Sequence, residues 1–153
     1  MIILSIDSGI EKTGYAVFKN KKYVNSALIK TSKNNSTEIR LEEIYSQLKK
    51  VFEKFKPDML VVEQLFFFKN QKTFIRVAQA QGIALLLAAQ NNINVKFLTP
   101  LQVKQTVTGY GQADKKSIQK MIRLELQIDI KQDDEADAIA CGLAYIYLNR
   151  DIH

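Results

Sequence analysis

Four acidic residues of this sequence stand at the ends of apolar segments: Asp7, Glu63, Asp134 and Asp137. The first two follow apolar, β-branched runs, and the last two open a long apolar segment rich in alanine. Because residues three apart on a helix share a face, Asp134 and Asp137 are expected to point the same way. Four carboxylates converging in a partly buried site would repel one another, and a divalent cation relieves that repulsion. An all-oxygen site of this kind suits Mg²⁺ or Mn²⁺.

Each acid also has a simpler explanation. Asp7 precedes Ser8-Gly9, and Asp is a common turn former, while a Glu that ends a strand is often solvated. Acids in the first turn of a helix complement its dipole, and this helix has four: Asp133, Asp134, Glu135 and Asp137. Taken singly, these explanations are preferable, above all for Asp133 and Glu135. The combination favours a metal site, because two acids follow buried strands and Asp137 is flanked by alanines.

Other catalytic side chains are scarce. The only histidine is His153, the last residue, and terminal residues are usually mobile. The single cysteine, Cys141, lies in an apolar run and is predicted to be a core residue, so no internal disulfide is possible. A reducing, cytoplasmic setting is therefore expected, and catalysis by histidine or a zinc site of His and Cys is not.

The sequence predicts an α/β fold with a mixed five-stranded sheet, three antiparallel strands and then two parallel ones, flanked by helices. Strands 2–7 and 59–62 would be parallel neighbours, so Asp7 and Glu63 would project from one edge of the sheet. The other expected strands cover 13–19, 22–30 and 94–98. The expected helices run from Ser36 or Thr37 to near Pro57, over 71–90, briefly after Pro100, from Asp114 to about Leu126, and from about Asp134 to Leu148.

The composition predicts one globular domain, residues 1–153, with a polyanionic partner. The net charge is +6 and the pI about 9.3, which fits nucleic acid but does not by itself exclude an acidic membrane surface. No apolar stretch approaches the ~20 residues of a membrane span. The N-terminal apolar run is too short for a signal peptide and lacks a basic region before it.

Two lysines are candidates for binding phosphate. Lys115 is expected in the first turn of its helix, where free backbone N–H groups and the lysine could hold one phosphate together. A solvated lysine is the default, but the position after a Gly-Tyr-Gly loop makes the functional role an equal alternative. Lys104 is similar. More general phosphate contacts are expected from six other basic residues: Lys69, Lys72, Arg76, Lys116, Lys120 and Arg123.

Three consecutive aromatics, Phe66, Phe67 and Phe68, follow the strand that ends in Glu63. Core packing is the default for aromatic rings, but three in a row cannot all face inward on one element. An exposed ring beside the acids could stack on an unpaired base or wedge a base step open.

A set of motifs in this order resembles the RuvC-type Holliday junction resolvases across nearly the whole chain. The motifs are Ile6-Asp-Ser-Gly-Ile-Glu-Lys-Thr-Gly-Tyr15, Val62-Glu-Gln-Leu-Phe66, Lys69-Asn70, Ala78-Gln-Ala-Gln-Gly82, Thr99-Pro-Leu-Gln-Val-Lys104, Val107-Thr-Gly-Tyr-Gly-Gln-Ala-Asp-Lys115 and Asp134-Glu-Ala-Asp-Ala138. Two positions depart from the family pattern: Ser8 stands where proline is usual, and Gln81 where arginine is common. The departures and the short chain are compatible with a divergent or phage-encoded member.

The resemblance implies an RNase H-like fold and a homodimer that cuts two opposed strands of a four-way junction with Mg²⁺. It implies that the four acids are catalytic and bind the metal, that Lys104 and Lys115 are functional lysines, and that Phe66 stacks on bases. Lys69 and Lys116 are added as DNA-binding residues. Helix 71–90, apolar on more than one side, is the candidate dimer interface, although a purely buried helix would read the same way.

The predicted function is therefore a Mg²⁺-dependent endonuclease that resolves four-way and other branched DNA with two ions per site. It would leave 5′-phosphate and 3′-hydroxyl ends and could work with branch-migration machinery. Two alternatives stay open: an RNase H-like nuclease acting on structured RNA, and a branched-DNA-binding protein without catalysis.

Overall fold

The computed structural model describes residues 1–66 and 70–150, and its sheet has the predicted architecture. The strand order is β3-β2-β1-β4-β5, with β1, β2 and β3 antiparallel and with β4 parallel to both β1 and β5. The order of three antiparallel strands followed by two parallel ones is thus confirmed. The strands are β1 (Ile2–Asp7), β2 (Lys12–Lys19), β3 (Lys22–Lys30), β4 (Met59–Glu63) and β5 (Asn94–Leu98).

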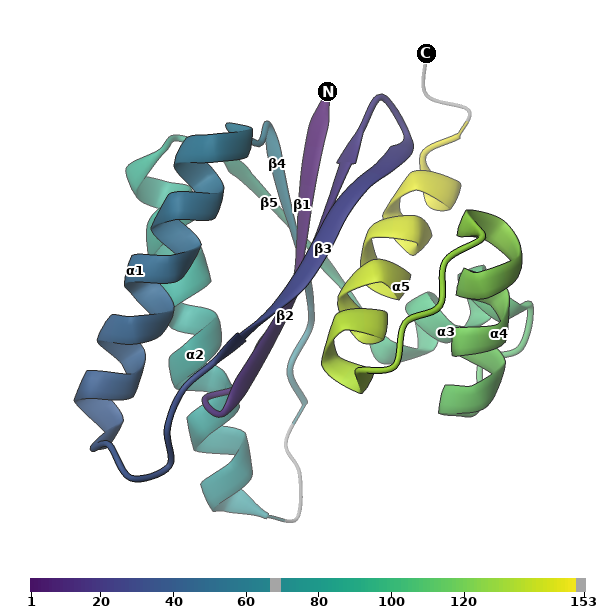
Figure 1. Ribbon diagram of the computed structural model, residues 1–153. Helices are drawn as coiled ribbons and strands as arrows, with labels where there is room; N and C mark the ends of the chain where they lie inside the picture. The colour runs from purple at the N-terminus through teal and green to yellow at the C-terminus, as the bar shows by residue number, and fades with distance from the viewer. Residues whose placement is uncertain (67–69, 151–153) are drawn as a thin grey trace.

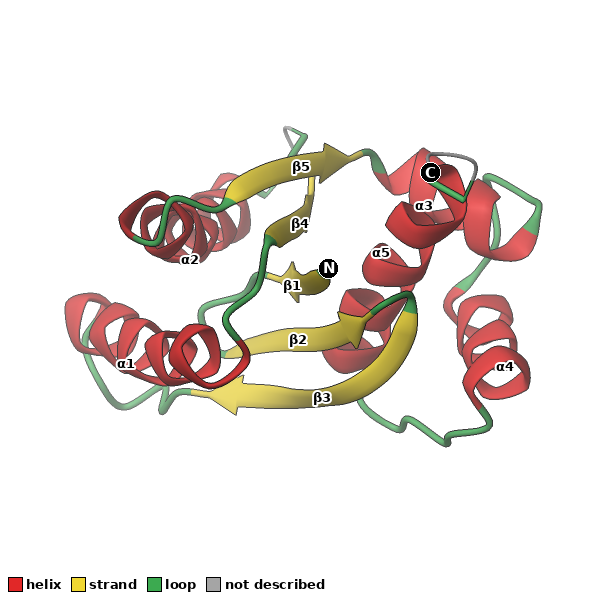
Figure 2. Ribbon diagram, turned by 90° about the horizontal axis from the view of Figure 1, so that it is seen from above, coloured by secondary structure: helices red, strands yellow, loops and turns green. Residues whose placement is uncertain are grey.

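Helices cover both faces of the sheet, as predicted. Two pack on one face, and three gather on the other, where α5 lies directly against the strands (Figure 1). Seen from above, the strands separate the two groups of helices (Figure 2). The helices are α1 (Thr37–Phe55) and α2 (Gln71–Gln90) on the first face, and α3 (Pro100–Thr108), α4 (Lys115–Leu126) and α5 (Asp133–Leu148) on the second.

The alternation of β1 divides the core between the two faces. Leu4 and Ile6 are buried in the cluster that α1 and α2 complete, whereas Ile3 belongs to the cluster around α5. Ser5 faces α5 as well, and its hydroxyl donates a hydrogen bond of 2.7 Å to the Ala138 carbonyl. Burying an isoleucine or leucine contributes ~1.5–3 kcal/mol, so this strand anchors both layers.

Local signals explain where the helices of the second face begin. Thr99 and Gln102 form a reciprocal capping box at the start of α3. Asp114 caps α4 by accepting from the Ser117 backbone N–H at 2.8 Å, as the sequence predicts. The last helix begins one residue earlier than expected, at Asp133. Within the described parts of the chain, none of the helices is both long and apolar enough to cross a membrane.

Candidate active site

The parallel pairing of β1 with β4 places two of the predicted acids at one edge of the sheet. Ile6 lies opposite Val62 in the register, so Asp7 and Glu63 are the next residues on two adjacent strands. Both strands end there, and both side chains are partly buried rather than fully solvated. The expectation that these two carboxylates share an edge is confirmed.

A close backbone approach brings the start of α5 to the same edge. Gly14 on β2 lies opposite Asp7, and a Cβ built on Gly14 would be 2.0 Å from the carbonyl oxygen of Asp134. Only glycine allows this contact, because any side chain would occupy the place of the helix backbone. The remaining apolar face of α5 is buried against the sheet, so its first turns cannot move away.

All four predicted acids line one cavity of about 300 Å³, together with Ser8, Gly9, Leu65, Val77 and Gln81 among others. A second cavity of about 480 Å³ adjoins it, because both are lined by Glu63 and Asp137. Lys104 and Lys115 line this second cavity. The structure therefore places both functional lysines of the prediction beside the acids.

A third cavity, of about 350 Å³, also adjoins the acid cavity. It shares Gly9, Val77 and Asp134 with the first cavity and adds Lys12 and Arg76. Both cavities that adjoin the acids thus contain basic side chains, Lys104 and Lys115 in one and Lys12 and Arg76, beside Glu11, in the other. A polyanionic strand laid through these adjoining cavities would meet positive charge next to the acids.

Burial and mutual repulsion make these carboxyl groups hard to ionise. Burial raises the pKa of Asp7 well above its usual value, and the charges of Asp137, Asp134 and Glu63 and a side-chain hydrogen bond with Asp134 raise it further. The pKa of Asp137 is raised to about 6, chiefly by burial. Burial also raises the pKa of Glu63, followed by the charge of Asp137. Such clustered shifts are typical of functional sites.

The two lysines partly offset this repulsion. Lys104 lowers the pKa of Glu63, and Lys115 is the largest influence that lowers the pKa of Asp137. Asp137 is in turn the main cause of the raised pKa of Lys115. Because two cations do not balance four carboxylates, the cluster keeps an excess of negative charge that a divalent cation would neutralise.

The donor set, four carboxylates without histidine or cysteine, fits a hard cation such as Mg²⁺. Within 1–66 and 70–150, no three acidic, histidine or cysteine side chains already form a metal-coordinating group. The metal assignment therefore depends on the donor chemistry and the raised pKa values. Cys141, six residues beyond Glu135, is buried in the core as predicted.

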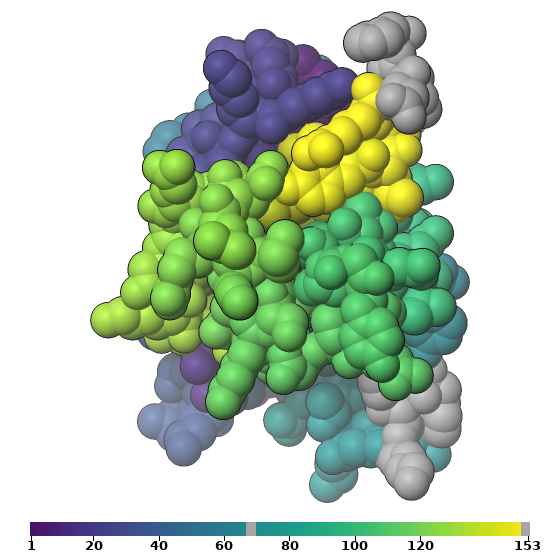
Figure 3. Space-filling view, turned by 90° about the vertical axis from the view of Figure 1, so that its right-hand side faces the viewer, coloured from purple at the N-terminus to yellow at the C-terminus, as the bar shows by residue number. Residues whose placement is uncertain are grey.

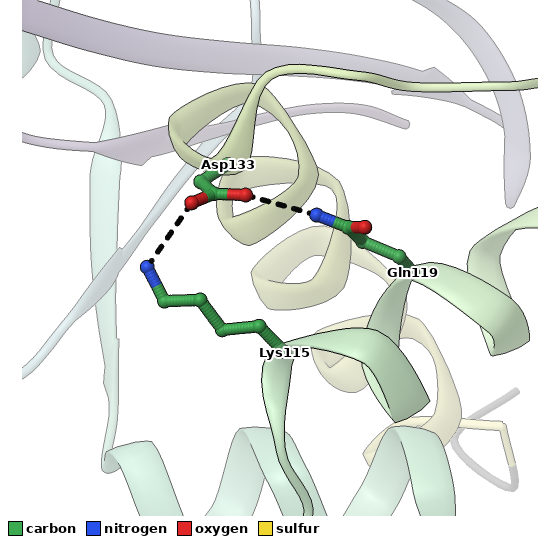
Figure 4. A network of polar contacts seen from close by, with 3 residues as sticks. All are labelled: Lys115, Gln119 and Asp133. Carbon is green, nitrogen blue, oxygen red and sulfur yellow. Dashed lines mark hydrogen bonds and ion pairs between the residues drawn. The ribbon is translucent and has the colours of Figure 1, made fainter.

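Lys115 is held by an acid that the sequence did not assign to the site. Its Nζ lies 3.4 Å from Asp133 Oδ2, and Gln119 Nε2 donates to Asp133 Oδ1 at 2.9 Å (Figure 4). Asp133 was expected only to complement the helix dipole, and it also orients a cavity lysine. Lys116 is exposed on α4 and lines none of the cavities described above.

Phe66, the ring that the resemblance singled out from the run of three phenylalanines, is exposed. Its side chain has 48% of its surface accessible, three residues after Glu63 and directly after the cavity residue Leu65. The predicted DNA contact Lys69, and Phe67 and Phe68, lie outside the described residues.

Two other polar residues of the acid cavity, Gln81 and Ser8, had no role in the site that the sequence predicted. Gln81 is buried, and its Nε2 donates to the backbone carbonyl of Glu63 at 2.9 Å. The Oγ atom of Ser8 is buried without a hydrogen-bond partner in the structure. The sequence gives no signal for the first contact, because it joins residues 18 positions apart. No sequence signal reveals the second, since serine is ordinary in a turn.

Comparison with known proteins identifies the family. The model of the family "Crossover junction endodeoxyribonuclease RuvC" matches residues 3–145. The chain belongs to the RuvC family. The RuvC of Fusobacterium nucleatum is 46% identical over 152 residues, covering 95% of this chain and 80% of the relative.

Solved structures agree with the family and the fold. Thermus thermophilus RuvC in complex with a Holliday junction substrate matches with a TM-score of 0.89 at 28% identity, covering 98% of this chain and 95% of that one. The yeast mitochondrial Holliday junction resolvase shares only the fold, with a TM-score of 0.68 at 16% identity over 97% of this chain and 80% of its own. The RuvC resemblance, the RNase H-like fold and the class of crossover junction endodeoxyribonuclease are thereby confirmed. The roles of individual acids, lysines and Phe66 stay predictions.

Proposed function

We propose that this RuvC-family chain is a Mg²⁺-dependent endonuclease that resolves four-way DNA junctions. The observation that carries the proposal is the convergence of Asp7, Glu63, Asp134 and Asp137 on one cavity with lysines beside it. The match to Thermus thermophilus RuvC in complex with a Holliday junction substrate supports this choice of DNA. Other branched DNA is a second substrate of the same kind.

The four acids would hold two Mg²⁺ ions. Bound there, the ions would activate a water for in-line attack on the phosphodiester and stabilise the leaving 3′ oxygen, which gives 5′-phosphate and 3′-hydroxyl ends. The chain itself supplies the negative cluster and its fixed geometry. Gln81 holds the backbone of Glu63, and Gly14 lets α5 approach Asp7.

The cationic residues would position the DNA strand. Lys104 and Lys115 line the cavity next to α3 and α4, and Arg76 and Lys12 line the cavity next to the start of α2. Asp133 restrains the Lys115 ammonium group at 3.4 Å. We assign Lys69 and Lys116 to weaker phosphate contacts outside the acid cavity.

Phe66 would provide selectivity for an opened crossover. Its ring is accessible next to the acid cavity, so an unpaired base could stack on it. Phe66→Ala is expected to leave Mg²⁺ binding unchanged and to reduce junction cleavage. Unchanged junction cleavage would show that Phe66 has no role in binding the junction.

A homodimer would present two such sites to two opposed strands of a junction, which has approximate two-fold symmetry. The outer face of α2 is the candidate interface. Ile75 and Leu86 on it are 53% and 48% exposed, whereas Ala84 and Leu87 of the same helix are buried against the rest of the chain.

The proposal is tested with Asp7→Asn, which keeps the size of the side chain and removes its charge. We expect loss of junction cleavage with junction binding retained in a gel-shift assay. Cleavage at the wild-type rate would contradict a role in the chemistry, and loss of binding would indicate a folding role for Asp7. Comparison of junction, duplex and structured RNA separates resolution from the RNA-directed alternative.

A further inference from the structure

The loop that joins α3 to α4 presents an aromatic side chain to solvent. Tyr110 has 62% of its surface accessible, more than either of the other exposed aromatic residues, Phe66 and Phe97, in the described parts of the chain. An exposed tyrosine alone is ordinary and requires no functional explanation. Tyr110 differs in two respects: its backbone is held by hydrogen bonds, and it lies in sequence between residues that line a cavity beside the acids.

The backbone of Tyr110 is fixed at both of its polar groups. Its N–H donates to Thr108 Oγ1 at 3.1 Å, and its carbonyl accepts from the Ala113 N–H at 3.1 Å. The Thr108 hydroxyl also contacts the last turn of α3, lying 2.7 Å from the Lys104 carbonyl. Gly109 ends α3 with a φ of 80°, a left-handed conformation that glycine adopts without strain. The ring therefore projects from a restrained turn, and little backbone entropy remains to be lost on binding.

The restrained turn also packs against α3. A Cβ on Gly111 would lie 2.4 Å from Leu101 Cδ1, so the Leu101 side chain occupies the space that a side chain at position 111 would need. Leu101 is itself 58% exposed. Tyr110 thus belongs to a turn that packs on α3 through Gly111 and Leu101, rather than to a free loop tip.

This turn stands at the border of the cavity that contains Lys104 and Lys115. Lys104 precedes it, and Ala113, Asp114 and Lys115 follow it, and all four line the cavity that also contains Glu63 and Asp137. Helices α3 and α4 lie side by side on one face of the molecule, below α5 in the space-filling view (Figure 3). A DNA strand bound to Lys104 and Lys115 would pass close to this turn.

We propose that Tyr110 stacks on a nucleobase of the DNA strand that leaves the acid cavity on the α3–α4 side. The inference rests on the proposed function, since it takes branched DNA as the ligand. Aromatic rings beside a cationic groove are how proteins bind single-stranded segments, because every base offers a face for stacking. If Phe66 also stacks on a base, as proposed above, Tyr110 would hold the strand at a second point.

The test compares Tyr110→Ala and Tyr110→Phe with Leu124→Ala, a matched control on α4 that is 64% exposed and outside the cavity. Affinity is measured by fluorescence anisotropy with a labelled four-way junction, in Ca²⁺ to suppress cleavage. We expect Tyr110→Ala to weaken binding roughly 5- to 150-fold, the range that stacking on one base provides. Tyr110→Phe and Leu124→Ala are expected to stay within about two-fold of wild type.

Salt dependence identifies the kind of contact. A stacking side chain releases no counterions, so Tyr110→Ala should leave the slope of log K against log salt unchanged. Lys115→Ala in the same assay should reduce that slope by about 1. A base analogue completes the test: 2-aminopurine placed in turn at the positions flanking the crossover should be quenched at one position by wild type and Tyr110→Phe, but not by Tyr110→Ala.

Each other outcome overturns the inference. If Tyr110→Ala bound the junction with wild-type affinity, Tyr110 would not contact the DNA. If Tyr110→Phe lost as much affinity as Tyr110→Ala, the contact would be made by the hydroxyl and not by the ring. A reduced salt slope would indicate a disturbed Lys104 or Lys115. If wild type failed to bind the junction at all, the proposed function itself would fall, which none of the Tyr110 outcomes can mimic.

Discussion

The backbone carbonyl of Asp134 lies where a side chain of Gly14 would be, at 2.0 Å from the ideal Cβ position. Gly14 also pairs with Asp7 across β1 and β2. One glycine therefore fixes the distance between the acid at the end of β1 and the acids that begin α5. The geometry of the proposed metal site depends on this contact between two backbones.

Gly14→Ala should separate α5 from the sheet, because neither backbone is free to yield. We expect a loss of about 1–3 kcal/mol in the free energy of unfolding, typical of overpacking a core. Cleavage should fall on the order of 100-fold, as a displacement of about 1 Å can cause. The control is Gly82→Ala, whose added Cβ meets nothing within 4 Å. Its unfolding temperature should match or exceed that of wild type, and an equal result for Gly14→Ala would contradict the account.

Asp137 should make the metal-free protein less stable as pH rises. Its pKa in the fold is about 6, above its ordinary value of 3.8, so the folded state binds a proton more tightly than the unfolded chain. The contribution of Asp137 to the free energy of unfolding is therefore fully present below pH ~4 and is lost as the pH rises through about 6. Asp137→Asn should therefore raise the free energy of unfolding at pH 7.5 by about 3 kcal/mol, with little change at pH 4.

Thermal or urea unfolding without metal at the two pH values measures this effect. Asp129→Asn, an exposed carboxylate paired with Arg123 across the surface, is the control and should show no comparable gain. A wild-type protein as stable at pH 7.5 as Asp137→Asn would show that burial and the neighbouring acids do not penalise the Asp137 charge, and would contradict the metal assignment.

Mg²⁺ should reverse the penalty, because the ion replaces the protons that the raised pKa values of Asp7, Glu63 and Asp137 favour. Its affinity should rise with pH through about 6. Calorimetric titrations in buffers of different ionisation enthalpy should show net proton release at pH 6. Proton-neutral binding at that pH would mean that the ion binds elsewhere.

Much of this site can be predicted from the sequence. The acids Asp7 and Glu63 follow runs whose β-branched character marks buried strands, and buried strands end at a common edge when they run parallel. Three adjacent rings cannot share one core, which predicts one exposed ring, and the resemblance to the RuvC-type resolvases singled out Phe66. The contacts that complete the site were not predictable, because they join residues far apart in sequence. Gln81 to the Glu63 carbonyl is a consequence of packing between α2 and β4.

The role of Asp133 could not be predicted from its position at the start of the last helix. In the sequence it resembles the other acids at the start of the last helix, and only the fold places Lys115 at 3.4 Å from its carboxylate. We expect Asp133→Ala to leave Mg²⁺ affinity unchanged and to reduce cleavage modestly, about 2- to 10-fold, because an exposed ion pair contributes little. Loss of cleavage as complete as in Asp7→Asn would make Asp133 a fifth site acid and contradict its positioning role.

The most direct test of the proposed function is a nicking assay on a mobile four-way junction with Mg²⁺, with Ca²⁺ and without metal. The account predicts paired cuts in opposed strands with Mg²⁺ only, with ends that ligase can seal and with little cutting of duplex DNA or structured RNA. Intact junctions in Mg²⁺, or structured RNA cut as readily as the junction, would contradict it.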